Sequence, residues 1–504
     1  MSFLPLHFNL TIHPSIQAFA GDVILRWKCV QEEAETIMNR LVHSSQDPRI
    51  IQLGKTINRL RQQMSIFDPK ADMNALIQEL EQQEVKLAKL SNAYQHYLNK
   101  SNVRMDDLKL MLPPKTAVIE LKQYQHYKFK TGEWGDICLA AALILPNAER
   151  ITLEDLGPRK DVLSIFEKVR TAKTQQERTS ALKQLYSKLF GSFDKHIAQA
   201  ETIYISPDGL THQIAFSRLI LPDGRFWVQR QTLCRIQTSR DLMDQNKIPN
   251  NQGTLVAMGG IDFNHFPDVK VTSSDEKTAD VATQMSIQRI AKKNESFNPL
   301  PFSKKEIQQI APYYQARWKK TPQLFKGTKA SEYQIKHLDA PPHILHLSTH
   351  GFYLSSSENR TERPMMLSGL ALAGSNLGLK GKKDKGNEEG ILFAIEVAGL
   401  NLTGTELVVL SACDTGKGSI DYSEGVYGLL RAFRLAGAHE IMMTLWPLYD
   451  QSSSEFLSHF YKTWLGSAKM TPSKALRKTQ LSFIKQNKDS ELWAPYVMVG
   501  GKLQ

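Results

Sequence analysis

The chain has 504 residues, of which 41% are hydrophobic and 23% charged, and its 63 Lys and Arg against 51 Asp and Glu give a formal net charge of +12. These fractions are typical of globular proteins and exclude wholesale disorder, a collagen-like repeat and a multi-span membrane protein. The length exceeds that of one ordinary hydrophobic core, so we expect two or three domains.

The positive charge is spread along the chain. Dense Lys and Arg are the electrostatic signature of proteins that bind polyanions. The one tight cluster, Lys380, Lys382, Lys383 and Lys385, lies between glycines and has no interleaved aromatic residues. We therefore interpret it as a solvated loop, with a nucleic-acid contact as the alternative, and we expect no nucleic acid as a direct ligand.

The four cysteines, Cys29, Cys138, Cys234 and Cys413, are far apart in the sequence. No two of them have the spacing of metal ligands, and a disulfide framework is unusual in a chain of this size. The first 15 residues lack the basic segment and continuous apolar run of an export signal, and no 18 uncharged apolar residues follow one another. We therefore expect a cytoplasmic protein with no membrane association, no metal and no cofactor.

Residues 1–112 are predicted to form an α-helical hairpin or a remnant of helical repeats. One helix face is predicted by Leu53, Ile57, Leu60 and Met64. After a break at Phe67-Asp68-Pro69, two heptad rows follow, Leu76, Gln83, Leu90 and Tyr97 with Leu80, Leu87 and Tyr94. The hairpin either packs onto its own protein or docks a partner. No 34-residue period occurs, so intact tetratricopeptide repeats are not predicted.

Residues 113–300 are predicted to form an α/β subdomain. Its expected strands are 117–121, 138–145, 202–205 and 254–258, and its expected helices lie around 162–169 and 180–190. The strands at 202–205 and 254–258 end in glycine-containing turns, but no G-x-G-x-x-G or G-K-[ST] follows them. A phosphate-binding loop is therefore not expected.

Residues 301–504 are predicted to form a second α/β subdomain that holds the site. Three short apolar runs, 344–350, 407–412 and 441–446, are each followed by Gly or Pro or by a turn. Such runs are typical of parallel strands buried on both faces. The fold class is therefore an α/β sandwich with a mainly parallel sheet, in which ligands bind outside the carboxyl ends of the strands.

Two residues capable of nucleophilic chemistry end the first two of these strands. His350 ends the first and Cys413 ends the second, 63 positions later. A thiol becomes an efficient nucleophile beside a base, and a histidine in that place can also protonate a leaving amine. Gly351 lets the backbone approach a substrate, so its N–H and that of Cys413 are candidate donors to a tetrahedral oxyanion. An inert core cysteine is the alternative interpretation of Cys413.

His346 lies on the same strand face as His350, because residues i and i+4 of a strand point the same way. A metal site would need further ligands, and neither an H-E-x-x-H helix nor a cysteine pair is present. We interpret His346 as an interior histidine with satisfied hydrogen bonds, with a supporting role beside the site as the alternative. Serine-hydrolase chemistry is not expected, because no G-x-S-x-G occurs at a strand-to-helix turn.

These motifs, with their surroundings, resemble the CHAT family of caspase-like cysteine peptidases, which belongs to the same broad clan as caspases and separase. The matching stretches are 346–351, 407–416, 424–429, 445–450 and 493–500, with a further likeness at Ser206-Pro207-Asp208-Gly209. The resemblance implies a caspase-like α/β/α sandwich and a dyad of Cys413 as nucleophile and His350 as general acid and base. It also implies an oxyanion hole formed by the backbone amides of Gly351 and Cys413.

The resemblance extends to substrate specificity. Leu445-Trp446 followed by Asp450 is similar to a separase segment whose acidic residue lines the pocket for a basic side chain at P1. We expect Asp450 to bind Arg or Lys there, with Asp414 as the second candidate. The alternative is that Asp450 caps the helix that begins near Ser452. The glycine- and lysine-rich segment 374–390 is expected to be a mobile loop, with a lid, an activation loop or an insertion as alternatives.

The sequence thus predicts a cysteine endopeptidase that cuts specific protein substrates in a bacterial defence, cell-death or regulatory pathway. The expected partners are a protein substrate, encoded nearby, and an activating protein. The alternative is a non-catalytic caspase-like scaffold that binds a partner protein. Retention of both Cys413 and His350 favours the enzyme.

Overall fold

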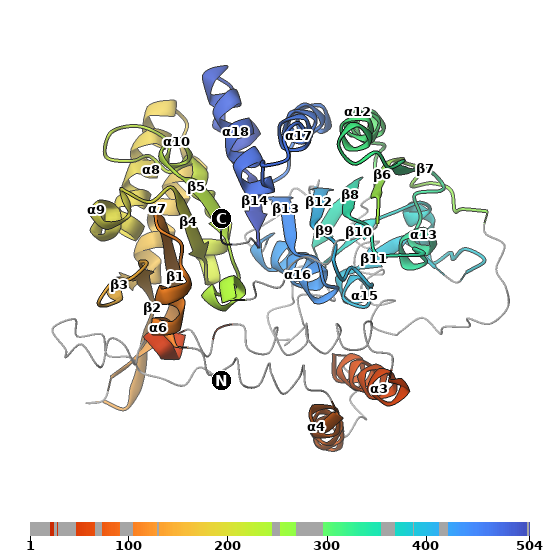
Figure 1. The fold of residues 1–504 in the computed structure, drawn as a ribbon, viewed down its shortest axis with the longest axis horizontal. Coiled ribbons are helices and arrows are strands. Elements are labelled where there is room, and N and C mark those ends of the chain that lie inside the picture. The colour runs from red at the N-terminus through yellow and green to blue at the C-terminus, as the bar shows by residue number, and fades with distance from the viewer. Residues whose placement is uncertain are drawn as a thin grey trace. The chain divides into compact units, whose positions relative to one another are not determined.

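The computed structural model describes residues 21–24, 28, 47–65, 73–90, 104–128, 131–243, 253–268, 296–353, 368–386, 388–412, 422–500 and 503 (Figure 1). The chain forms two compact units: unit 1 comprises residues 1–30, 101–246 and 469–504, and unit 2 comprises 31–100 and 247–468. Both units are therefore discontinuous in sequence. The domain boundaries at 112/113 and 300/301 stay a prediction.

The sheet of unit 1 combines antiparallel and parallel strands. In spatial order the strands are β3 (Thr152–Pro158), β2 (Glu133–Ile144), β1 (Thr116–Lys128), β4 (Thr202–Ser206), β5 (Thr232–Arg235) and β14 (Tyr496–Val499). β1, β2 and β3 pair antiparallel, whereas β1, β4, β5 and β14 pair parallel. Alternate residues of β1 enter two different hydrophobic clusters, Ile119 one and Val118 the other. The sheet is therefore buried on both faces.

Short helices surround this sheet. They are α6 (Met105–Met111), α7 (Arg159–Thr171), α8 (Gln175–Phe190), α9 (Asp194–Ile197), α10 (Trp227–Arg230), α18 (Pro472–Lys485) and α19 (Ser490–Trp493). Four 3₁₀ helices, η1 (Gly191–Phe193), η2 (Gly209–Gln213), η3 (Phe216–Arg218) and η4 (Ser239–Met243), lie in the connections. α8 begins where Thr174 accepts a hydrogen bond from the Glu177 N–H, which satisfies one of the free donors of the first turn. The helices predicted around 162–169 and 180–190 lie within α7 and α8.

The main sheet of unit 2 is parallel throughout. Its spatial order is β13 (Glu440–Thr444), β12 (Leu407–Ala412), β8 (Ile344–Thr349), β6 (Leu255–Ile261) and β7 (Gln323–Gly327). A small antiparallel sheet of β9 (Gly351–Tyr353), β10 (Ser368–Ala371) and β11 (Ile391–Phe393) adjoins the end of β8 in sequence. The predicted α/β class with a mainly parallel sheet is confirmed in both units.

Helices cover both faces of the parallel sheet of unit 2 (Figure 1). α12 (Pro301–Trp318) and α17 (Asp450–Leu465) pack together on one face, and α15 (Ala394–Val397) and α16 (Tyr422–Leu435) lie on the other. The shorter helices are α13 (Glu332–Lys336) and α14 (Ser375–Gly378). Every residue of β8 is buried, as expected for a continuous apolar strand in the middle of a parallel sheet.

The predicted helical hairpin is present as α3 (Pro48–Ser65) and α4 (Met73–Leu90), which pack against each other. Ile57, Leu60 and Leu87 of the predicted faces are buried. Tyr94 and Tyr97 lie outside the described residues. Within the described ranges, no helix has both the length and the hydropathy that crossing a membrane requires.

The prediction of a mobile loop at 374–390 is wrong for its first part. Residues 374–376, 378 and 379 are buried, and α14 forms there. Gly374 has a φ of 82°, and a Cβ at this position would collide with the ring of Phe266. The glycines thus allow a left-handed backbone and close packing, rather than flexibility. Lys380, Lys382 and Lys385 are exposed, so the predicted solvation of the lysine cluster is confirmed for them.

Candidate active site

The candidate site lies where β8 and β12 end next to each other. Their register pairs Leu407 with Ile344 and continues without a shift to Ala412 and Thr349. His350 and Cys413 are the next residues in the sequence after Thr349 and Ala412. Cys413 and Asp414 lie outside the described residues, whereas His350, Gly351 and Asp450 are described.

The imidazole of His350 is held by a backbone carbonyl. His350 is only 3% exposed, and its Nε2 lies 2.7 Å from the carbonyl oxygen of Asn298. A carbonyl oxygen can only accept a hydrogen bond, so Nε2 must carry the hydrogen. In the neutral ring the lone pair is then on Nδ1, which is the nitrogen that can take up a proton.

Two phenylalanine rings enclose His350. The centroid of the Phe297 ring lies 5.7 Å from that of His350 in a stacked arrangement, and the centroid of Phe263 lies 5.2 Å away. This burial lowers the pKa of His350, and the hydrogen bond to Asn298 opposes the shift only in part. A neutral imidazole with Nδ1 unprotonated is therefore the main form near neutral pH.

The residue before Asn298 is held from the segment predicted to be a loop. Asn376 of α14 accepts a hydrogen bond from the Phe297 N–H at 2.8 Å and donates one to the Phe297 carbonyl at 3.0 Å. Its own N–H donates to the Phe263 carbonyl at 2.8 Å. One buried residue thus holds the backbone of both phenylalanines that enclose His350, Phe297 through its side chain and Phe263 through its backbone N–H.

The chain after His350 turns into the small sheet. Ala371 N–H donates to the His350 carbonyl at 2.9 Å, and the Thr349 hydroxyl donates to the Ala371 carbonyl. Gly351 opens β9 and is paired with Leu370 of β10. Both residues are buried. The backbone at the predicted oxyanion position is therefore held by β10 at two consecutive residues, His350 and Gly351.

His346 is an interior histidine with both ring nitrogens in hydrogen-bond contact, as the sequence indicated. Its Nε2 lies 2.8 Å from Oε1 of Glu306 on α12, and its Nδ1 lies 3.2 Å from the hydroxyl of Tyr461 on α17. His346 and Glu306 are fully buried, and within the described part of the chain the second oxygen of Glu306 has no partner. This trio joins the strand of His350 to two covering helices.

Asp450 is the first residue of α17, and Tyr449 occupies the N-cap position. Its carboxylate accepts a hydrogen bond at 2.6 Å from the Phe302 N–H in the first turn of α12. Asp450 therefore does not cap its own helix, as the alternative interpretation held. It caps the neighbouring helix α12 instead. Burial raises the pKa of Asp450; the Phe302 N–H lowers it, and the charge of Glu306 raises it further.

One short segment contacts both His350 and Asp450. Asn298 binds the imidazole, and Phe302, four residues later, binds the carboxylate. Four residues span at most roughly 14 Å even when fully extended. The carboxylate of Asp450 and the imidazole of His350 are therefore both held by one short stretch of backbone. Pro301 at the start of α12 is the sequence signal that marks this segment, because proline favours the first turn of a helix.

A cluster of carboxylates elsewhere in unit 2 has the spacing of a cation site. Glu332, Glu388 and Glu396 surround the ammonium of Lys336 at 2.5 Å, 2.8 Å and 2.7 Å. Burial of Glu332 raises its pKa well above the usual range. Lys336 already supplies the positive charge that a metal ion would bring, so these residues act as an ion-pair cluster.

Comparison with known proteins gives a family and a fold. Residues 179–501 match the family model described as "CHAT domain". Two relatives named tetratricopeptide repeat protein 28, from Mus musculus and Homo sapiens, are 30% and 29% identical over 116 and 119 residues. Each match covers 23% of this chain, and the chain spans only 5% of either relative.

Solved structures with a similar fold include proteins of two kinds. Separase in the Saccharomyces cerevisiae separase–securin complex matches with a TM-score of 0.41 and 10% identity, over 92% of this chain and 36% of that one. The Arg-specific cysteine proteinase gingipain R matches with a TM-score of 0.32 and 10% identity, over 66% of this chain and 69% of that one. These similarities concern the fold alone.

Proposed function

This chain belongs to the CHAT-domain family, and we propose that it is a cysteine endopeptidase in which Cys413 is the nucleophile and His350 the general acid and base. The observation that supports this most directly is the register of β8 and β12. It brings the carboxyl ends of the two strands together immediately before His350 and Cys413. The hydrogen bond from Nε2 to Asn298 supports the same proposal, because it leaves Nδ1 as the basic nitrogen.

In the proposed reaction the thiol of Cys413 loses its proton to Nδ1 of His350. The thiolate sulfur attacks the carbonyl carbon of the scissile peptide bond and forms a C–S bond. The negative charge on the former carbonyl oxygen is stabilised by the N–H groups of Gly351 and Cys413. The C–N bond then breaks, and His350 gives its proton to the departing amine.

Hydrolysis completes the cycle. A water molecule transfers a proton to Nδ1 of His350 while its oxygen attacks the thioester carbon. The C–S bond breaks, the product leaves as a carboxylic acid, and the sulfur of Cys413 recovers the proton from His350. Both halves of the reaction thus transfer protons through Nδ1 of His350. The proposed mechanism therefore depends on the tautomer that the hydrogen bond to Asn298 selects.

Asp450 is proposed to bind the basic side chain at P1, with Asp414 as the second candidate. Asp450 is only partly buried, and no Lys or Arg in the described ranges forms an ion pair with it. A carboxylate with one oxygen on the Phe302 N–H keeps the other for an incoming guanidinium or ammonium. A protein substrate encoded near this chain, and an activating protein partner, complete the proposal.

The test is cleavage by the wild-type chain and by Cys413→Ala. Each would be co-expressed with candidate neighbouring proteins, and fragments would be sequenced to locate the cut. We expect a fragment with wild type, none with Cys413→Ala or His350→Ala, and retention of cleavage with Cys234→Ala as the control. If Cys413→Ala performs every cellular role of the wild type, the non-catalytic scaffold replaces the enzyme.

A further inference from the structure

Unit 1 contains a buried arginine that has no acidic partner in the described part of the chain. Arg235 ends β5 and is 7% exposed. Its guanidinium donates to the carbonyl of His212 at 2.9 Å and to the carbonyl of Ile214, and its carbon lies 4.8 Å from the centroid of the Phe216 ring. No Asp or Glu in the described residues forms an ion pair with it, so a full positive charge is buried beside neutral groups only.

Such a charge is costly to remove from water. Burial alone lowers the pKa of Arg235, to about 9, and no neighbouring charge contributes to the shift. The group therefore remains protonated at neutral pH, stabilised by two carbonyls and an aromatic ring but by no carboxylate among the described residues. Buried charges in proteins are usually paired, so an unpaired one calls for an explanation.

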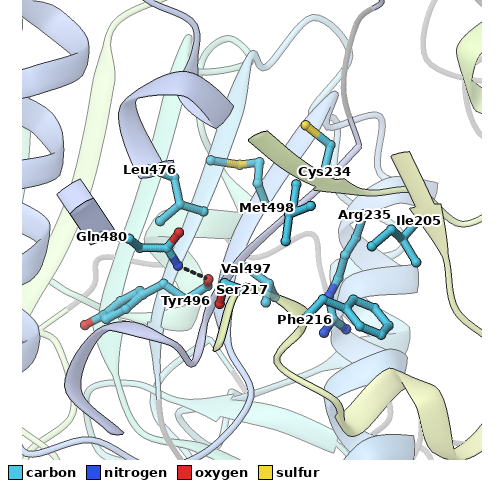
Figure 2. Close-up of a pocket in the computed structure, with 11 residues that line it drawn as sticks. Ile205, Phe216, Ser217, Cys234, Arg235, Leu476, Gln480, Tyr496, Val497 and Met498 are labelled. Atoms are coloured by element: carbon cyan, nitrogen blue, oxygen red, sulfur yellow. Dashed lines mark hydrogen bonds between the residues drawn. The ribbon is translucent and has the colours of Figure 1, made fainter. Parts of the chain in front are cut away.

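Arg235 lines a pocket, and Figure 2 shows its surroundings. The walls are mainly apolar, with Leu233, Leu476, Val497 and Met498 among them, and the polar groups are few. Ser217 and Gln480 supply two of these, and Gln480 donates to the carbonyls of Trp493 and Tyr496. An apolar enclosure with a few convergent polar groups is the usual composition of a small-molecule site.

The pocket lies between parallel strands of the unit 1 sheet and a covering helix. It is lined by residues of the neighbouring parallel strands β4, β5 and β14, and Arg235 is the last residue of β5. Tyr496, Val497 and Met498 precede the last residue of β14, so the pocket runs along the strands, beside Leu476 and Gln480 of α18. The candidate catalytic residues all belong to unit 2, so this pocket is not part of the site described above.

From the position of Arg235 in this apolar pocket we propose that the pocket binds a small carboxylate. The carboxylate oxygens pair with the remaining N–H groups of Arg235, and the short apolar chain of the ligand packs against Leu476, Val497 and Met498. Only two of the five N–H donors of the guanidinium have a protein acceptor among the described residues. The planar fork of arginine matches a carboxylate in two parallel hydrogen bonds. A cavity of about 30 Å³ has room for a group of this size.

The same kind of arginine elsewhere in unit 1 provides a matched control. Arg477 of α18 also donates to two backbone carbonyls, those of Val228 at 2.9 Å and Gln229 at 3.0 Å, and burial lowers its pKa. Arg477 does not line the pocket. If the role of Arg235 were only to hold backbone carbonyls, the two arginines would behave alike toward ligands.

The experiment measures thermal unfolding and calorimetric binding of the full chain with acetate, propionate and N-acetylglycine at constant ionic strength. Propionamide, which has the shape of propionate without its charge, and chloride serve as ligand controls. We expect saturable binding of at least one carboxylate and none of propionamide. Preference for acetate or propionate identifies a free acid as the ligand, whereas preference for N-acetylglycine identifies the carboxyl end of a peptide.

Two variants test the assignment to Arg235. Arg235→Lys keeps the charge but loses the planar fork, so it should bind the carboxylate at least tenfold more weakly, while Arg477→Lys binds like wild type. Arg235→Met should abolish binding. If Arg235→Met does not fold, the comparison of the two lysine variants decides. Absence of saturable carboxylate binding to wild type, or equal binding by Arg235→Lys, would overturn the proposal.

Discussion

Asn376 pairs with both backbone polar groups of Phe297, accepting from its N–H at 2.8 Å and donating to its carbonyl at 3.0 Å. The next residue is Asn298, whose carbonyl holds Nε2 of His350. The geometry of the imidazole thus depends on a side chain that is 26 residues away in sequence and lies in α14.

Asn376→Ala is expected to reduce kcat about tenfold or more and to change KM little. The reason is that the Phe297–Asn298 backbone loses its two side-chain contacts, and small displacements of a catalytic group have large effects on rate. Asn264→Ala is the matched control, because Asn264 contacts Asn376 but neither Phe297 nor His350. Steady-state kinetics on a cleaved peptide measure the effect; an unchanged kcat would show that Asn298 stays in place without Asn376.

Phe297→Ala is expected to raise the pKa of His350 toward the ordinary value of about 6.5. Burial lowers this pKa in the wild type, because exclusion of water disfavours the charged imidazolium, and removing the stacked phenylalanine readmits water. A higher pKa protonates Nδ1 at higher pH, so the acidic limb of the pH–rate profile should move to higher pH.

NMR titration of His350 in Cys413→Ala protein measures this pKa directly. Phe352→Ala is the control, because Phe352 is buried and contacts Phe297 rather than the imidazole. A His350 pKa that moves equally in both variants would attribute the shift to general loosening instead of to the stacked ring.

Asp450→Asn and Asp450→Ala should separate capping from substrate binding. Asparagine keeps an oxygen for the Phe302 N–H but removes the charge, so Asp450→Asn should lower kcat/KM for Arg at P1 by about 10- to 100-fold with little loss of stability. Asp450→Ala loses the acceptor as well and should lower the free energy of unfolding by about 1 kcal/mol. Cleavage rates of paired Arg and norleucine peptides, with urea unfolding, provide both measurements. If Asp450→Asn still prefers Arg at P1, Asp414 rather than Asp450 binds the P1 side chain.

Glu306 and His346 should be strongly coupled in a double-mutant cycle. Either single change to Leu leaves a buried charge or donor without its partner, which costs about 3–5 kcal/mol for a buried carboxylate and about 1–3 kcal/mol for a buried donor. The double variant removes both groups and should be less destabilised than the sum of the two single variants. Urea unfolding of the four proteins measures the coupling, and additive changes would mean that the two side chains are energetically independent.

Gly390→Ala and Gly381→Ala should differ although their backbones are alike. The φ angles are 76° and 75°, so both substitutions carry the cost of a left-handed residue, about 1 kcal/mol. A Cβ at Gly390 also meets the Ala373 carbonyl and lies 2.7 Å from the Ser375 N, whereas nothing lies within 4 Å at Gly381. Gly390→Ala should therefore be less stable than Gly381→Ala by at least about 1 kcal/mol in thermal unfolding. Equal melting temperatures would indicate that α14 shifts freely.

The parallel strands could be predicted from sequence because their cause is local. The runs at 344–350 and 407–412 are rich in apolar residues, a composition typical of strands that are buried on both faces. The rule that sites form at the carboxyl ends of such strands then indicated His350 and the neighbouring Gly351 without any coordinates. The hairpin of α3 and α4 was predictable for the same reason, since hydrophobic periodicity is a property of consecutive residues.

The surroundings of His350 depend on contacts that no local pattern encodes. Phe263, Asn298 and Asn376 come from three separate segments, and each is an ordinary loop or turn residue in the sequence. The glycine-rich composition of 374–390 predicts flexibility, whereas the positive φ of Gly374 and its close approach to Phe266 place α14 in the packed structure. Composition and spacing determined the fold class and the candidate dyad, because apolar burial follows residue order. Packing between distant segments set the tautomer of His350 and the cap at Asp450, because a hydrogen bond needs a partner that only the folded chain brings within reach.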